Sequence, residues 1–168
     1  MDPVRLQDIY AQHAAALVLY ARQWCTAPDD AVQEALLALS KCHPDPDDPV
    51  AWLYTATKRR ALNIARGELR RQEHHTRAAQ QRSEWFVTAV DTSAAASAEL
   101  GERVIAGLQQ LQGEQRELVV ARVWGNLSFE QLGQMHGCAP STALRRYQAA
   151  LACLRTSVLA DLCPNGNC

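Results

Sequence analysis

Residues 127–155 constrain this chain most, because they have the pattern of two helices joined by a tight turn. The first helix is expected to start at Ser128 as its N-cap, with Gln131 completing a capping box. Gly133 is small enough for a second helix to approach closely, and Gly137 can adopt the left-handed conformation that ends a helix. The pattern therefore predicts a helix-turn-helix unit.

The second helix of this unit is predicted to begin near Pro140, because the first turn of a helix tolerates a residue without an N–H group. Ser141 or Thr142 is expected to cap it. At about 100° per residue, one arc of this helix is apolar and is expected to be buried. That arc holds Ala143, Leu144, Tyr147, Ala150, Leu151 and Leu154. The opposite arc holds Ser141, Arg145, Gln148 and Ala152, with Thr142 and Arg146 on its flank.

The polar arc suits the major groove of DNA. Arginine and glutamine match guanine and adenine edges with two hydrogen bonds, and small side chains let a helix lie deep in the groove. A plain helical hairpin with solvated Arg145 and Gln148 fits this pattern equally well. The choice between the two depends on the rest of the chain.

The composition favours an all-α fold. Of the 168 residues 48% are hydrophobic, and few stretches alternate with a period of two. We expect two small helical domains joined by a linker, the second containing the helix-turn-helix. The predicted divisions are a first domain 1–75, a linker 76–99, a second domain 100–160 and a disordered tail 161–168.

Within these domains, apolar spacing predicts helices over 4–24, 29–41, 50–72 and from about 99 to 160. The Pro/Asp-rich residues 43–49 are expected to form a loop. In the linker, Trp85, Phe86 and Val90 are candidates for docking on a neighbouring element.

The 29–41 helix has one residue that its amphipathic pattern does not explain. Its expected core face is Val32, Ala35, Leu36 and Leu39. Leu37 falls instead on the polar side, among Asp30, Gln33, Glu34 and Lys41. A single exposed leucine is common and needs no function. An apolar residue inside a polar rim is also how protein interfaces are built.

The 50–72 helix carries a basic stripe. With Trp52 as the origin, four polar side chains project within about 40° of it, and these are Arg59, Asn63, Arg66 and Arg70. Residues 51–82 hold eight basic and two acidic residues, although the net charge of the whole chain is −1. Solvated helix faces usually mix charge signs. An aromatic residue followed by positively charged residues, with no acid among them, therefore favours binding of single-stranded nucleic acid. Its bases can stack on the ring, and its phosphates can be neutralised by the arginines.

Other classes of protein find little support in the sequence. No apolar run is long enough to span a membrane, and the N-terminus lacks a signal-peptide pattern, so we expect a cytoplasmic protein with reduced cysteines. The cysteine spacing matches no zinc signature, and neither a metal nor a cofactor is expected. No catalytic triad, carboxylate pair or phosphate-binding loop is present, which argues against an enzyme.

Three segments together resemble the extracytoplasmic-function (ECF) sigma factors of bacterial RNA polymerase. DDAVQEALLAL (29–39) is similar to the core-binding helix of that family, and PVAWLYTATKRRALNIAR (49–66) to its −10-reading helix. Residues 111–155 are similar to its −35-reading domain. The segments occur in the family's order and separation.

The resemblance implies a transcription initiation factor with three contact surfaces. It implies that the β′ clamp coiled coil of core polymerase binds Asp30, Gln33, Glu34 and Leu37. It implies that the opened −10 strand binds Trp52, Arg59, Asn63, Arg66 and Arg70. It implies that the −35 element is read by Ser141, Thr142, Arg145 and Gln148, with Arg146 on phosphate. An anti-sigma factor is a further candidate partner.

Two positions of the −10 helix depart from the family, which often has Asn and Asp where this chain has Arg59 and Asn63. In the −35 helix Ala149 replaces a usual basic residue, so weaker or altered −35 binding is expected. The main alternative is a conventional helix-turn-helix regulator that acts as a dimer without polymerase. A helical interaction protein that does not bind DNA is a second alternative.

Overall fold

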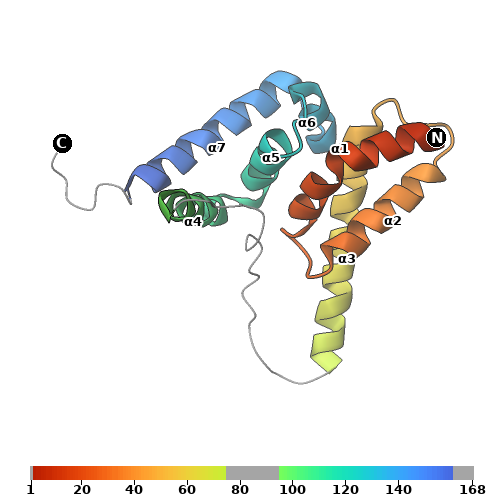
Figure 1. Cartoon of the computed structure of the whole chain (residues 1–168), viewed down its shortest axis with the longest axis horizontal. Helices are drawn as coiled ribbons and strands as arrows, with labels where there is room; N and C mark the ends of the chain where they lie inside the picture. The colour runs from red at the N-terminus through yellow and green to blue at the C-terminus, as the bar shows by residue number, and fades with distance from the viewer. Residues whose placement is uncertain (1, 75–94, 161–168) are drawn as a thin grey trace.

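The computed structural model describes residues 2–74 and 95–160, and all regular structure in those ranges is helical. This confirms the predicted all-α fold (Figure 1). The helices are α1 (Pro3–Ala21), α2 (Pro28–Ser40), α3 (Pro49–His74), α4 (Ala95–Gln110), α5 (Gly113–Val123), α6 (Phe129–His136) and α7 (Pro140–Ala160). The proposed docking residues Trp85, Phe86 and Val90 and the predicted tail 161–168 lie outside the described ranges. None of the described helices is long and apolar enough to cross a bilayer.

Proline fixes where several helices begin. Pro3, Pro28 and Pro49 each occupy the first position of a helix, where a missing N–H costs nothing. Asp48 caps α3, since its carboxylate accepts from the N–H groups of Val50 at 3.0 Å and Ala51 at 2.9 Å. The Pro/Asp-rich loop predicted from the sequence thus ends in an N-cap that orients α3.

Helices α1, α2 and α3 pack into an N-terminal unit. The predicted core face of α2 is confirmed for Val32, Ala35 and Leu39, which are buried, whereas Leu36 is half-buried and Leu37 is exposed. Tyr20 of α1 meets Tyr54 of α3 edge-to-face, with ring centroids 5.1 Å apart. The last turns of α3 project beyond α1 and α2 (Figure 1), which leaves part of its apolar side uncovered.

The first helix of the helix-turn-helix forms as predicted. Ser128 and Gln131 make both hydrogen bonds of the capping box, and Gly137 ends α6 in the left-handed conformation, at φ 61°. At Gly133 an added Cβ would lie 2.6 Å from the carbonyl oxygen of Cys138, so only glycine allows the turn to pass this closely. Helix α7 then starts at Pro140.

Two predictions about α7 are wrong. Ser141 and Thr142 do not cap this helix, because it starts at Pro140 and they lie inside its first turn. Leu144 and Leu151 are not buried, being 37% and 38% exposed. The side of α7 that packs inward is a narrower seam than the predicted arc, and it consists of Ala143, Tyr147, Ala150 and Leu154.

Helices α4 to α7 form a C-terminal unit around this seam. The turn between α4 and α5 is held by Arg116, whose guanidinium donates to the carbonyl oxygens of Leu108 and Gln109, each at 2.8 Å, and Leu111, at 2.9 Å. Helix α4 begins at Ala95, inside the range predicted to be linker.

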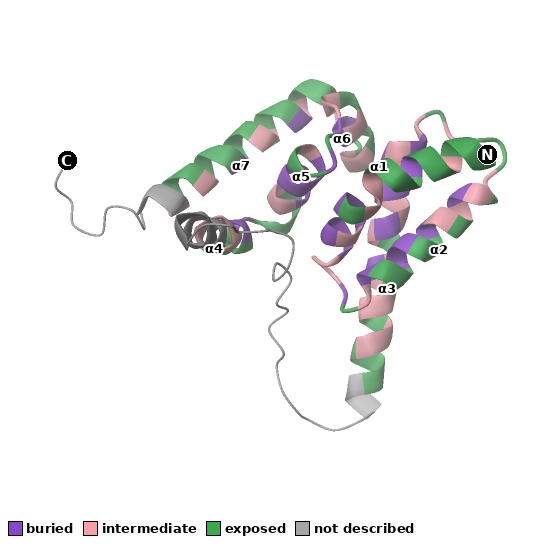
Figure 2. Cartoon of the chain, viewed as in Figure 1, coloured by how far each residue is buried: buried purple, intermediate pink, exposed green. Residues whose placement is uncertain are grey.

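The two units pack directly against each other. Buried residues from both belong to one continuous core, in which Tyr54 of α3 joins Leu118 of α5 and Leu132 of α6. Figure 2 shows buried positions where α1, α2 and α3 pack together and on α5, which contacts α1. The two units are thus separate along the chain but share one core in the folded protein.

Candidate nucleic-acid interface

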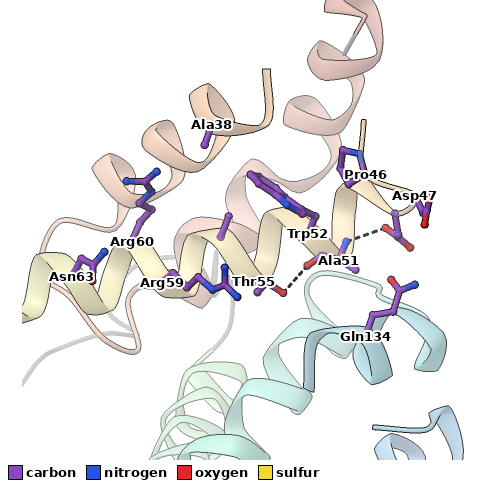
Figure 3. Close-up of a pocket in the computed structure, with 12 residues that line it drawn as sticks. Ala38, Pro46, Asp47, Ala51, Trp52, Thr55, Arg59, Arg60, Asn63 and Gln134 are labelled. Carbon is purple, nitrogen blue, oxygen red and sulfur yellow. Dashed lines mark hydrogen bonds between the residues drawn. The ribbon is translucent and has the colours of Figure 1, made fainter. Parts of the chain in front are cut away.

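The basic side of α3 borders a groove of about 690 Å³. Three residues of the predicted −10 set line it together, namely Trp52, Arg59 and Asn63 (Figure 3). Trp52 is half-buried, so one part of its ring is anchored and another part faces the groove. The groove thus offers an aromatic surface, a cation and an amide along one face of α3, and the carboxylates of Asp47 and Asp48 also line it.

The remaining two residues of the set continue this line along α3. The guanidinium of Arg66 donates to the side-chain oxygen of Asn63 at 3.1 Å, and both residues are exposed. Arg70 is exposed one turn further on. The set therefore forms one continuous strip, and its two distal arginines lie beyond the groove.

Sequence reasoning missed several residues of the groove. Arg60 lines it and pairs with Glu34 of α2, at 3.4 Å between Nη1 and Oε2. Thr55 lines it while its hydroxyl donates to the carbonyl oxygen of Ala51 at 3.0 Å. Arg60 is adjacent to the stripe in sequence but lies off its axis, so the helical projection excluded it.

Gln134, which also lines the groove, comes from α6 in the C-terminal unit (Figure 3). A neighbouring residue of α6, Gln131, donates to the Asp48 carboxylate at 3.3 Å. No local pattern could have placed these residues here, because they are more than 80 positions from the start of α3.

The face of α7 that was predicted to read DNA is only partly exposed to solvent. Ser141, Arg145 and Gln148 are exposed, and Thr142 and Arg146 are half-buried. The guanidinium of Arg146 forms an ion pair with Glu114 of α5, which it would have to exchange for a phosphate on binding DNA. Arg145 and Arg146 thus differ, since Arg145 is exposed to solvent whereas Arg146 is half-buried and paired with Glu114.

The third predicted surface lies on α2. Asp30, Gln33, Glu34 and Leu37 are all exposed. Glu34 and Leu37 border a shallow hollow of about 320 Å³ that Ala38, Lys41 and Arg60 complete. An apolar side chain surrounded by charged ones suits contact with another protein.

Two half-buried histidines lie on α1 and α6. Burial lowers the pKa of His136 on α6 below 6.5, against the opposing effect of Glu117 and Glu114. Burial also lowers the pKa of His13 on α1, which lies edge-on to the Tyr54 ring. Both imidazoles are therefore neutral near pH 7, and neither supplies positive charge to the interface.

Comparisons with known proteins find a likeness among the solved structures. No family model matches the chain, and no curated protein matches it. A solved structure, that of CnrH in complex with the cytosolic domain of CnrY, has a TM-score of 0.62 with this chain at 21% sequence identity. The match covers 95% of this chain and 91% of CnrH. At this identity, the chain shares the fold of CnrH along nearly its whole length.

Proposed function

We propose that this chain is a transcription initiation factor of the ECF sigma type, which binds core RNA polymerase and directs it to promoters. The observation that carries the proposal is the acid-free strip of Trp52, Arg59, Asn63, Arg66 and Arg70 on α3. This strip occurs in one chain with a helix-turn-helix, on the fold that the chain shares with CnrH, and three segments of the sequence resemble the ECF sigma factors. A non-enzymatic role fits, since the proposed task changes no covalent bond.

The −10 element would be held by α3. Unpaired bases stack on aromatic rings, and Trp52 presents such a ring at the start of the strip. Arginines further along neutralise the phosphates of a strand that follows the helix axis. The Asn63 side chain, whose oxygen accepts a hydrogen bond from Arg66, could donate or accept a hydrogen bond at a base edge.

The −35 element would be read by α7. Ser141, Arg145 and Gln148 are exposed at the N-terminal end of this helix, the end that enters the major groove in helix-turn-helix proteins. Core polymerase would bind α2 through Leu37 with Asp30, Gln33 and Glu34 around it. Because both units are tethered in one chain, each DNA contact can be weak by itself.

A protein that restrains this factor is a further proposed partner, since CnrH was solved in complex with the cytosolic domain of CnrY. The proposed role requires polymerase and promoter DNA, and so places the protein in the cytoplasm.

Promoter binding with and without core polymerase separates this proposal from a conventional regulator. In a mobility-shift assay, the initiation factor is expected to retard promoter fragments only when core enzyme is added. A dimer of the isolated chain that binds the same fragments tightly would favour the conventional regulator and contradict the proposal.

Replacing Arg145 by alanine is expected to relax −35 specificity. Arginine contacts both acceptor atoms of guanine, and loss of such a pair costs about 1–3 kcal/mol of discrimination at one base position. Competition binding of the chain with core polymerase to a randomised −35 library measures this. Arg155→Ala, an exposed arginine further along α7, is the control and should leave the preference unchanged. An unaltered preference in Arg145→Ala would remove Arg145 from the reading face.

A further inference from the structure

Leu144 is an apolar side chain near the N-terminal end of α7, the end proposed to enter DNA. The apolar pattern of the sequence predicts it on the buried face, yet it is 37% exposed. Since α7 starts at Pro140, Leu144 opens the second turn of the helix. At about 100° per residue, it projects between the buried seam of α7 and the arc that holds Ser141 and Gln148. Part of a leucine side chain therefore faces solvent beside groups that can form hydrogen bonds.

The side chains that share this face with Leu144 are polar. Ser141 precedes it by three residues and Gln148 follows it by four, and these spacings place side chains on one side of a helix. Both are exposed, and so is the adjacent Arg145. An exposed leucine by itself needs no function. The position of Leu144 among three polar side chains that would contact base edges is what distinguishes it.

Thymine is the base that an apolar side chain at this place would recognise. Each base pair presents a distinct pattern in the major groove, and thymine presents a C5-methyl group there. Contact between this methyl group and a leucine removes apolar surface of both from water. The major-groove edges of guanine, cytosine and adenine present donors and acceptors that a leucine cannot satisfy. Leu144 would therefore select thymine rather than hold DNA of any sequence.

Leu151 has almost the same exposure as Leu144 but a different place on α7. It is 38% exposed and follows Leu144 by seven residues, which is about 10 Å along the helix axis. Recognition helices contact base edges with their N-terminal residues. Leu144 is therefore placed to reach a base, whereas Leu151 is not. Because the two leucines project in nearly the same direction, Leu151 controls for a general effect of exposed apolar surface.

We propose that Leu144 contacts the methyl group of a thymine in the −35 element and so selects thymine at one position. This rests on the proposed function, since it assigns one base of the DNA that α7 would read. The geometry also limits where that base lies. Leu144 and Gln148 are about 6 Å apart along the helix axis, and two base-pair steps span about 6.8 Å. The thymine therefore lies within about two base pairs of the base that Gln148 contacts.

Deoxyuridine in place of thymine tests this proposal, because it forms the same base pair but lacks the methyl group. A promoter fragment is selected with the full-length protein and core polymerase, and each thymine of its −35 element is replaced in turn on either strand. We expect replacement of one thymine to weaken binding about fourfold, the effect of one CH₂-sized group left in water. Leu144→Ala should bind both DNAs with the same, reduced affinity. Leu144→Met, which keeps an apolar side chain of similar size, should retain the discrimination.

Leu151→Ala is the matched control and should keep the wild-type discrimination, since it shortens a leucine of nearly equal exposure. If no replacement weakens wild-type binding, the proposal is overturned. It is also overturned if Leu144→Ala weakens binding but leaves the ratio of the two affinities unchanged, because Leu144 then has only a structural role. Equal loss of association with core polymerase in Leu144→Ala and Leu151→Ala, with no effect of deoxyuridine, would make the two leucines a protein contact instead.

The base preference of Gln148→Ala gives an independent check of the geometry. The position at which this variant changes the preference should lie within about two base pairs of the thymine that deoxyuridine identifies. A more distant thymine would overturn the placement of Leu144. Circular dichroism establishes that each variant keeps its helices. If Leu144→Ala loses helicity, Leu144→Gln replaces it and should likewise not distinguish thymine from deoxyuridine.

Failure of this proposal and failure of the proposed function give different results. If the protein with core polymerase selects a −35 sequence but does not distinguish deoxyuridine from thymine, the proposed function stands and the assignment of Leu144 is overturned. If no fragment is selected even with core polymerase, the proposed function fails, and the assignment of Leu144 fails with it.

Discussion

Leu37→Asp is expected to abolish stable association of this protein with core RNA polymerase. Leu37 is 59% exposed on α2 and is the apolar member of the proposed contact set. A charge at the apolar centre of an interface costs about 2–4 kcal/mol, or roughly 30- to 1,000-fold in affinity. The stability of the fold should change by no more than about 0.5 kcal/mol, because the side chain contributes little to the core. A pull-down with tagged core enzyme measures the association.

Leu69→Asp is the matched control for this experiment. Leu69 is also 59% exposed, but it lies on the projecting end of α3 rather than on α2. Its replacement adds the same charge and removes the same apolar area. Retention of Leu37→Asp on core polymerase at the level of Leu69→Asp would exclude α2 as the polymerase-binding surface.

Reversing the charge at both Arg66 and Arg70 is expected to prevent promoter opening while leaving core binding intact. Both guanidinium groups are exposed on the α3 strip and would each neutralise a phosphate of the unpaired strand. Loss of two such contacts should reduce the salt dependence of strand binding by about 1.4 in the slope of log affinity against log salt. Permanganate reactivity of thymines in the −10 region measures opening.

Arg70→Glu and Arg71→Glu, compared as single variants, separate the strip from general charge effects. Both arginines are exposed, and Arg71 lies about 100° around the helix from the strip. Arg70→Glu should impair opening more than Arg71→Glu. Equal effects, or normal opening in the double reversal at Arg66 and Arg70, would remove this face of α3 from promoter recognition.

Local physical rules explain which features could be predicted from the sequence. Helix starts follow from proline at the first helical position, and the α6 boundaries follow from Ser128, Gln131 and Gly137, which act on backbone groups within four residues. The basic strip on α3 follows from helical periodicity alone. Each of these features depends on neighbours along the chain, so a sequence pattern carries the necessary information.

The features that sequence reasoning missed depend on contacts between distant segments. The ammonium group of Lys58 on α3 donates to the buried carboxylate of Glu117 on α5, 59 positions away, and nothing in either neighbourhood predicts this pair. The placement of Gln134 in the α3 groove depends on the same packing. The exposure of Leu144 and Leu151 has a related cause, since the width of the buried seam on α7 is set by the helices packed on it.

Transcription with purified core polymerase on a library of promoter fragments tests the central claim most directly. Sequencing of transcript 5′ ends would locate the start sites used with and without this protein. The account predicts discrete start sites that depend on the protein and share a pair of upstream elements about 25 base pairs apart. A protein that neither co-purifies with core enzyme nor directs it to any start site would contradict the account.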